Sequence, residues 1–233
     1  MKKDSQSSFG KFIFSVLTTA IVLPVIIFIA AGDWLWLEGW IFAVWVNAMV
    51  ISNMVYLYRN DPDLLAERSK APGSDNQKTW DKYLLTFAYL MAVVWFVIMP
   101  IEVKRLNWLV QFPLLLKGFG GLLLIPALFF IYQATVENTY LSTMVRLQDD
   151  RKQQVITSGV YGFVRHPLYL GCLMMLFGAP LLLGSIIGLF IAVIALIVLI
   201  FRIQGEEKML TDELEGYEDY KTKVKYRLFP LLW

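Results

Sequence analysis

The sequence has almost none of the residues from which disulfides and metal sites are built. Its 233 residues include one cysteine, Cys172, and one histidine, His166. A disulfide needs two cysteines and a cysteine- or histidine-cluster metal site needs several such ligands, so we expect neither. Charged residues are also scarce, at 17% of the chain, and the net charge is only +2. So small a net charge gives no reason to expect a nucleic-acid partner.

Hydrophobic residues, in contrast, make up 58% of the chain, whereas a typical soluble domain is about half apolar. The excess lies in long apolar runs, each near the roughly 20 residues that a membrane-spanning helix needs. These runs cover residues 12–31, 36–57, 83–101, 113–132, 167–184 and 186–203. We therefore predict an all-α, polytopic transmembrane helical bundle of about six spans.

Basic residues are unevenly distributed among the segments between these runs. If both termini are cytoplasmic, all but three of the 21 Lys and Arg residues lie on the cytoplasmic side, the exceptions being Lys104, Arg105 and Lys117. Cytoplasmic segments of membrane proteins carry such an excess. We predict a multi-pass integral protein of a bacterial inner membrane with both termini in the cytoplasm. Glu38 and Glu102 then lie near the outer face, where we expect them to be solvated.

The last two spans are separated by two residues, Gly184 and Ser185. So short a connection predicts a tight antiparallel helical hairpin over residues 167–203. The cytoplasmic ends of its helices then lie side by side, one carrying Arg165-His166-Pro167 and the other carrying Glu206-Glu207. Pro167 suits the first position of a helix, whose free amides attract an anionic group such as an amino-acid carboxylate.

We divide the chain into N-terminal spans, residues 1–133, and a second region, residues 134–233. The first region has a cytoplasmic loop at 59–82, in which a Pro-Gly pair predicts a turn between short helices. The second region holds a polar loop, the hairpin and a cytoplasmic tail. Apolar residues of the tail recur at spacings of three and four, which predicts an amphipathic helix with one apolar stripe. The stripe comprises Leu210, Leu214, Tyr217, Tyr220 and Val224.

The segment from about 137 to 230 resembles the isoprenylcysteine carboxyl methyltransferases with their bacterial relatives, and it is similar to the phospholipid N-methyltransferases. Their shared pattern is Gly-x-Tyr, Arg-His-Pro-x-Tyr-x-Gly, a helical hairpin, Glu-Glu-x-x-Leu and Tyr-x-x-Tyr. The residues that match it in order and spacing are Gly159 and Tyr161, Arg165 to Gly171, Glu206 to Leu210, and Tyr217 and Tyr220. The earlier spans resemble these families only in being apolar.

The resemblance implies an integral membrane methyltransferase that uses S-adenosylmethionine. Its acceptor would be a lipid-like or prenylated small molecule, methylated on a carboxylate or an amine at the cytoplasmic membrane surface. The residues expected to bind the cofactor are Gln154, Gly159, Tyr161, His166, Pro167, Tyr169, Gly171, Glu206 and Glu207. The residues expected to act in catalysis are Arg165, Glu137 and Asn138. A sulfonium methyl group is already activated, so such a site mainly aligns the nucleophile and excludes water, and we expect no metal.

Two other functions are compatible with parts of the sequence. NADPH-dependent membrane sterol and enone reductases share a similar Arg-His-Pro-x-Tyr core, but Val164, Leu168 and Cys172 replace their usual serine, asparagine and glutamate. A transporter would carry ionisable groups at the centre of its spans, and none is found there. A non-catalytic membrane protein fits the composition but gives no reason for the polar cluster at the hairpin ends.

Overall fold

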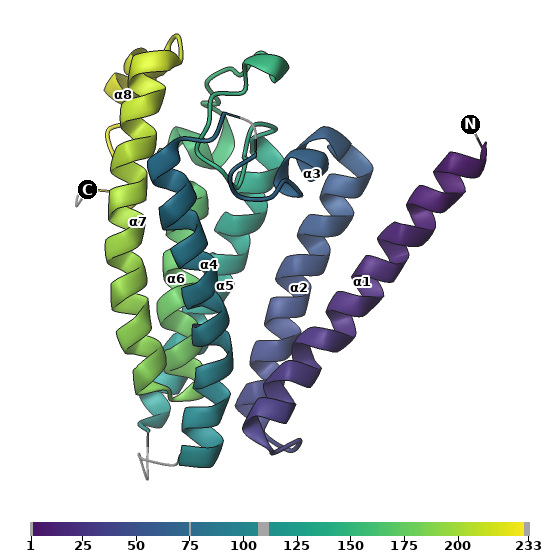
Figure 1. Cartoon of the computed structure of the whole chain (residues 1–233). Helices are drawn as coiled ribbons and strands as arrows, with labels where there is room; N and C mark the ends of the chain where they lie inside the picture. The colour runs from purple at the N-terminus through teal and green to yellow at the C-terminus, as the bar shows by residue number, and fades with distance from the viewer. Residues whose placement is uncertain (1, 75, 107–111, 231–233) are drawn as a thin grey trace.

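The computed structural model describes residues 2–74, 76–106 and 112–230, and all regular structure in these residues is helical (Figure 1). The six long helices are α1 (Lys2–Ala31), α2 (Leu37–Asn60), α4 (Thr79–Ile101), α5 (Leu114–Glu137), α6 (Pro167–Leu183) and α7 (Ile186–Glu213). The short helical segments are α3 (Pro62–Arg68), the π-helical turn η1 (Glu102–Leu106), the 3-10 turns η2 (Asp149–Arg151) and η3 (Gly159–Gly162), and α8 (Tyr217–Lys223).

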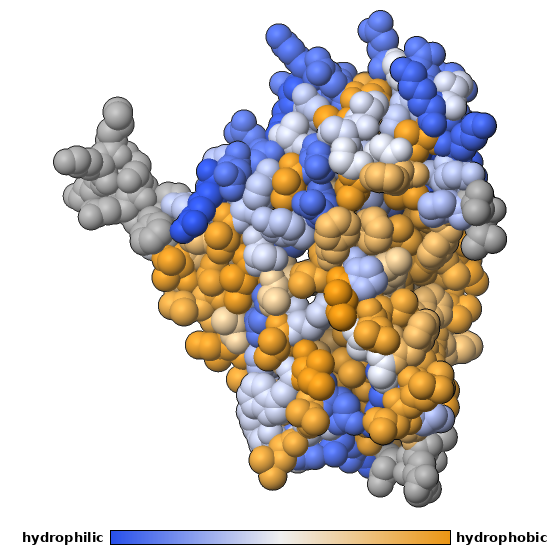
Figure 2. All heavy atoms as spheres, turned by 180° about the vertical axis from the view of Figure 1, so that it is seen from behind, coloured by the Kyte–Doolittle hydropathy of each residue, from blue (hydrophilic) through white to orange (hydrophobic). Residues whose placement is uncertain are grey.

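Five of the long helices, α1, α2, α4, α5 and α7, are long and apolar enough to cross a membrane. Helix α6 is also apolar but has only 17 residues, which at 1.5 Å per residue reach about 25 Å, less than the roughly 30 Å of a bilayer core. The predicted polytopic helical membrane protein is therefore confirmed, with five long spans and one shorter apolar helix. Figure 2 shows the surface expected of such a protein, with apolar side chains around the middle of the bundle.

The short segments α3, η2, η3 and α8 gather at one end of the bundle, which we call the polar end (Figure 1). On the face shown in Figure 2, most hydrophilic residues lie at this end, and a smaller group of hydrophilic residues lies at the opposite end. Helix α1 packs on α2 and α4 near its C-terminal end and leans away from the other helices toward its N-terminus (Figure 1). The closely packed part of the molecule is thus formed by α2 and α4 to α7.

Glycines allow α5 and α6 to approach each other closely. A Cβ atom added at Gly120 would overlap the backbone nitrogen of Leu182 and the carbonyl oxygen of Gly178. One added at Gly171 would lie 3.0 Å from the carbonyl oxygen of Ala127. Small residues serve in this way at helix contacts in membranes, where packing rather than the hydrophobic effect holds helices together. Gly171, the last residue of the Arg-His-Pro motif, is therefore a helix-packing position in this structure.

The predicted hairpin is present, with α6 ending at Leu183 and α7 beginning at Ile186. Glu102 of η1 supports its turn from outside. Its carboxylate accepts a hydrogen bond from the Ser185 hydroxyl and others from the backbone amides of Ile186 and Ile187, each at 3.1 Å. Glu102 is only 5% exposed, so the expectation that it is solvated was wrong. Its negative charge instead satisfies free amides at the N-terminus of α7, as capping carboxylates do.

The tail forms two helices instead of the single one expected. Helix α7 continues beyond the predicted span to Glu213, and α8 begins at Tyr217 after Gly216, whose φ of 83° is left-handed. That conformation suits glycine, and together with the extended Leu214 it separates the two helices. The apolar stripe is nevertheless present, since Tyr217, Tyr220 and Val224 form one buried cluster with Leu210, Leu214 and Val155. The stripe therefore packs α8 onto the polar end of the bundle.

Candidate functional site

A cavity of about 300 Å³ lies at the polar end, between the ends of α6 and α7, the loop before α6 and the tail. Its volume falls at the lower end of the range for small-molecule sites. The residues singled out from the sequence that line it are Asn138, Gln154, Tyr161, Arg165, His166, Pro167, Tyr169 and Glu206. Four others, Glu137, Gly159, Gly171 and Glu207, do not line it. Most of the motif thus converges on one place.

The tail holds the start of α6 through backbone hydrogen bonds. The amide of Arg165 donates to the carbonyl of Tyr226, and the amide of His166 donates to the carbonyl of Arg227, both at 3.0 Å. Pro167 then begins α6, as expected for a residue without an amide donor. The imidazole of His166 stacks on the ring of Tyr169 with centroids 5.5 Å apart. The side chains that face the cavity therefore come from a rigid helix start.

Glu207 is the centre of a buried ionic network behind the cavity. Its carboxylate lies 2.6 Å from Nε of Arg165, 2.7 Å from Nε of Arg227 and 3.2 Å from Nε2 of His166. Arg165 also donates to the carbonyls of Val224 and Lys225, and Glu207 is only 4% exposed. The two hairpin ends lie side by side, as predicted, but this glutamate contacts neighbouring cations and does not face the cavity.

Glu206 differs from Glu207 because its side chain lies in the cavity wall. It accepts a hydrogen bond of 2.6 Å from the hydroxyl of Tyr169. Among the described residues that line the cavity it is the sole carboxylate. Two adjacent glutamates that look equivalent in the sequence thus have different surroundings, one toward the ligand space and one toward protein cations.

Arg202 and Asp81 form a second buried ion pair beside the cavity, and sequence reasoning missed the role of Asp81. Nε of Arg202 lies 2.8 Å from Oδ1 of Asp81, and the arginine also donates to the carbonyl of Thr143. The other carboxylate oxygen of Asp81 accepts the amide of Val145 at 2.8 Å. The guanidinium of Arg202 lies 5.8 Å from the centre of the Tyr169 ring. The pair joins α4, α7 and the loop that covers the cavity. The sequence feature that could have indicated a role for Asp81 is an acidic residue at the start of an apolar run.

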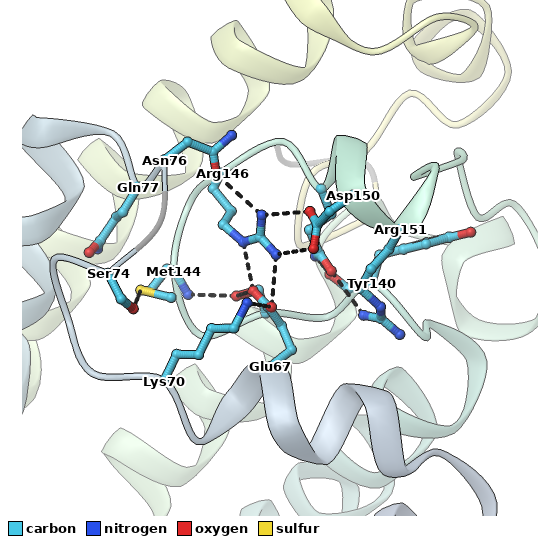
Figure 3. Close-up of polar contacts among 12 residues, drawn as sticks. Glu67, Lys70, Ser74, Asn76, Gln77, Tyr140, Met144, Arg146, Asp150 and Arg151 are labelled. Carbon is cyan, nitrogen blue, oxygen red and sulfur yellow. Dashed lines mark hydrogen bonds and ion pairs between the residues drawn. The ribbon is translucent and has the colours of Figure 1, made fainter.

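A third ion pair fastens the same loop to α3 (Figure 3). Arg146 makes a bidentate contact with Glu67, at 2.7 and 2.8 Å, and also reaches Asp150 at 3.0 Å. These hydrogen bonds, with those from Lys70 and Ser142, lower the pKa of Glu67 to about 2. Because Glu67 and Arg146 are far apart in the sequence and both look like ordinary loop charges, nothing in the sequence pairs them.

The turn η3, which contains Tyr161, lies next to the cavity and has Asn138 and Glu137 as neighbours. The amide group of Asn138 donates to the hydroxyl of Tyr161 at 3.3 Å, and burial raises the pKa of that hydroxyl. Glu137 accepts a hydrogen bond of 2.9 Å from the Ser158 hydroxyl, and its carboxylate lies against Gly159, whose φ is 53°. A side chain at Gly159 would collide with Glu137. Glu137 and Gly159 thus shape the turn η3 and do not face the cavity.

The cavity also has an apolar side that reaches into the membrane-spanning part of the bundle. Leu85 and Tyr89 of α4, Cys172 of α6 and Leu199 of α7 line it. Tyr89 is 46% exposed on the outside of the bundle, at a height where α4 is a spanning helix. One space therefore connects ionisable groups of the polar end with apolar side chains that reach the bilayer.

Part of the chain that contributes to this site matches a known protein family. Residues 116–216 match a family described as phospholipid methyltransferase. The match runs from α5 through the hairpin to the turn before α8, and so contains the motif residues from Gly159 to Leu210 but not Tyr217, Tyr220, α3 or α4. A search of curated proteins found no match to the chain.

Proposed function

Because this chain belongs to the phospholipid methyltransferase family and is an integral membrane methyltransferase that uses S-adenosylmethionine, we propose that it methylates the headgroup amine of a membrane lipid in the cavity of the polar end. The family implies the cofactor and a lipid-like acceptor. The amine, the cavity and the roles of individual residues are our proposal.

The chemistry of the cavity wall fits the cofactor. Ribose hydroxyls and positively charged groups need acceptors such as the carboxylate of Glu206, which already accepts the Tyr169 hydroxyl. The purine needs flat apolar surface, which Tyr161 and the stacked rings of His166 and Tyr169 offer. Gln154 and Pro167 complete this wall. We propose that these residues hold the cofactor.

Glu207 has a different role in this proposal. It binds Arg165 and His166 from behind and thereby fixes their orientation toward the cavity. Arg165 itself donates hydrogen bonds to Glu207 and to two backbone carbonyls. We therefore propose Glu207 and Arg165 as positioning residues, and we propose that Asn138, on the cavity wall, orients the acceptor.

The bound cofactor supplies a methyl group made electrophilic by the positive sulfur. Transfer to a neutral acceptor nitrogen would form the N–C bond at the expense of the C–S bond, leave the bonding electrons on sulfur and release one proton from the nitrogen to solvent at the polar end. The protein's contribution is alignment of nitrogen, carbon and sulfur and exclusion of competing water. The cavity between α6, α7, the loop and the tail offers a place for this alignment.

The observation that carries the proposal is the continuity of the polar and apolar parts of one cavity. Glu206 and His166 line one part, and Leu85, Tyr89 and Leu199 line the other. A water-soluble acceptor would have no use for the apolar part, whereas the chains of a lipid fit against it. The region 134–233 then holds the cofactor, and the N-terminal spans, residues 1–133, contribute the wall that meets the lipid.

Mass spectrometry of lipids after reaction tests this function. The purified chain is reconstituted in vesicles that contain phosphatidylethanolamine and given S-adenosylmethionine with an isotopically labelled methyl group. We expect the label on the headgroup nitrogen, in a bond that resists mild base. A base-labile label would show that the methyl acceptor is a carboxylate and not the amine. If the cofactor binds but the lipids carry no label, a lipid amine is not the acceptor.

A further inference from the structure

Arg68, the last residue of α3, lines the cavity from the side of the N-terminal spans. Its Nη1 donates to the backbone carbonyl of Leu141 at 3.0 Å. In the described parts of the chain, no carboxylate hydrogen bonds to it or forms an ion pair with it. Its neighbour in the sequence, Glu67, faces Arg146 instead. Arg68 therefore brings a positive charge to the cavity without a negative partner.

The other arginines that line the cavity are all paired with acids. Arg165 is paired with Glu207, Arg202 with Asp81, and Arg146 with Glu67 and Asp150. Among the described residues, each of these three arginines has a carboxylate partner, whereas Arg68 has none.

The surroundings of Arg68 are neutral and poorly hydrated. The groups that interact electrostatically with it are the hydroxyls of Tyr89 and Tyr161 and the thiol of Cys172, and no carboxylate is among them. Burial lowers the pKa of the Arg68 guanidinium, as expected where no acid compensates the loss of water. An isolated cation in such a place is stabilised when a ligand brings an anion to it.

We propose that Arg68 binds the phosphate group of the lipid acceptor. The guanidinium fork matches two phosphate oxygens, and arginine is favoured for this contact over lysine. The phosphate would lie beside α3, the lipid chains along Leu85 and Tyr89, and the amine toward Glu206. The inference rests on the proposed function and restricts the class of acceptor, because the acceptor must carry an oxyanion a few bonds from its nucleophilic nitrogen. Arg68 lies outside residues 116–216, so this selectivity comes from the N-terminal spans.

The carboxylate of the cofactor is the other source of an oxyanion for Arg68, and the test separates the two. Dodecyl phosphate, a single-chain phosphate amphiphile with no amine, is titrated calorimetrically into the full chain in a neutral maltoside detergent. The titration is repeated with S-adenosylhomocysteine at saturation. The variants are Arg68→Gln, Arg68→Lys, which keeps the charge but not the fork, and Arg59→Gln, which alters an exposed arginine near the end of α2 that does not line the cavity. Thermal unfolding confirms that each variant is folded.

We expect the parent and Arg59→Gln to bind dodecyl phosphate equally, Arg68→Gln to bind it at least about tenfold more weakly, and Arg68→Lys to lie between them. Saturation with S-adenosylhomocysteine should not displace dodecyl phosphate. Equal affinity of Arg68→Gln and the parent, or no binding by the parent, overturns the proposal. Displacement by S-adenosylhomocysteine assigns Arg68 to the cofactor carboxylate and overturns it as well. Because no methyl transfer is measured, this result is independent of whether the acceptor atom proves to be the amine.

Discussion

At the scale of single residues, adjacent positions in one motif have opposite surroundings. Glu206 and Glu207 follow each other on α7, yet one lies in the cavity wall and the other among Arg165, His166 and Arg227. On a helix, successive residues point about 100° apart, so only one of two neighbours can face a given space. The sequence predicted that both carboxylates lie beside the Arg-His-Pro segment and bind the cofactor, but it did not specify which of the two faces the cavity.

Glu207→Ala is expected to destabilise the fold as well as the site. The substitution removes the carboxylate that pairs with the buried Arg165, and breaking a buried pair in this way typically costs about 3–5 kcal/mol. Thermal unfolding in detergent measures the effect. The control is Glu213→Ala, which removes the half-exposed Lys78–Glu213 pair and should cost less than about 1 kcal/mol. Similar losses of stability in the two variants would mean that the Glu207 network is no stronger than a surface pair.

At the scale of helices, apolar runs and the two-residue connection were sufficient to predict the spans and the hairpin. What they could not predict depends on contacts between distant segments. The cap that Glu102 provides for α7, the anchoring of the loop by Asp81 and Glu67, and the break at Gly216 each involve partners or backbone angles that no local pattern specifies. The loop was therefore predicted as a polar segment and the tail as an amphipathic helix, but the arrangement of these segments was not predicted.

The contact between α5 and α6 is expected to tolerate no extra methyl group at Gly120. A Cβ there would overlap the backbone of α6, so Gly120→Ala should destabilise the fold by about 1–3 kcal/mol through overpacking. Gly118 is a matched control on the same helix, because a Cβ there meets nothing within 4 Å. Gly118→Ala should be neutral or stabilising by up to about 1 kcal/mol, since alanine favours helix. Equal unfolding temperatures for the two variants would rule out close helix packing at Gly120.

The attachment of the loop to α3 is expected to weaken in acid. The pKa of Glu67 is lowered from 4.5 to about 2 by its hydrogen bonds, above all those with Arg146. A carboxylate with a lowered pKa in the folded state stabilises that state fully above about pH 4.5, and this stabilisation is lost as the pH falls toward about 2. The unfolding temperature of the parent should therefore exceed that of Glu67→Gln near neutral pH, and the difference should shrink below about pH 4.5. A difference that is constant with pH would show that the ionised Glu67 adds nothing.

At the scale of the whole molecule, the bundle is asymmetric along its long axis. The helical segments of the site gather at one end (Figure 1), and the other end carries a smaller polar surface (Figure 2). Lys104 and Lys117 are each paired with an acid. Most basic residues belong to the polar end. The rule that positive residues face the cytoplasm therefore predicts that the polar end and its cavity lie on the cytoplasmic side of the membrane.

Accessibility labelling tests this orientation. The one cysteine, Cys172, is replaced by serine, and a new cysteine is introduced by Lys225→Cys at the polar end or by Asp33→Cys at the opposite end. In intact cells a membrane-impermeant maleimide should label the Asp33→Cys chain and should label the Lys225→Cys chain only after the cells are opened. The reverse pattern would place the cavity on the outer side of the membrane.

The most direct test of the central claim is the binding of S-adenosylhomocysteine to the purified parent and to Glu206→Gln. The account places the cofactor against the carboxylate of Glu206 in the cavity wall. Loss of a charged hydrogen-bond partner typically weakens binding about ten- to a hundredfold. We predict such a loss by calorimetry for Glu206→Gln, unchanged affinity for Glu213→Gln, unchanged unfolding temperatures for both, and no comparable binding of NADPH by the parent. If Glu206→Gln binds S-adenosylhomocysteine as tightly as the parent, the cofactor lies elsewhere and the account of this cavity is contradicted.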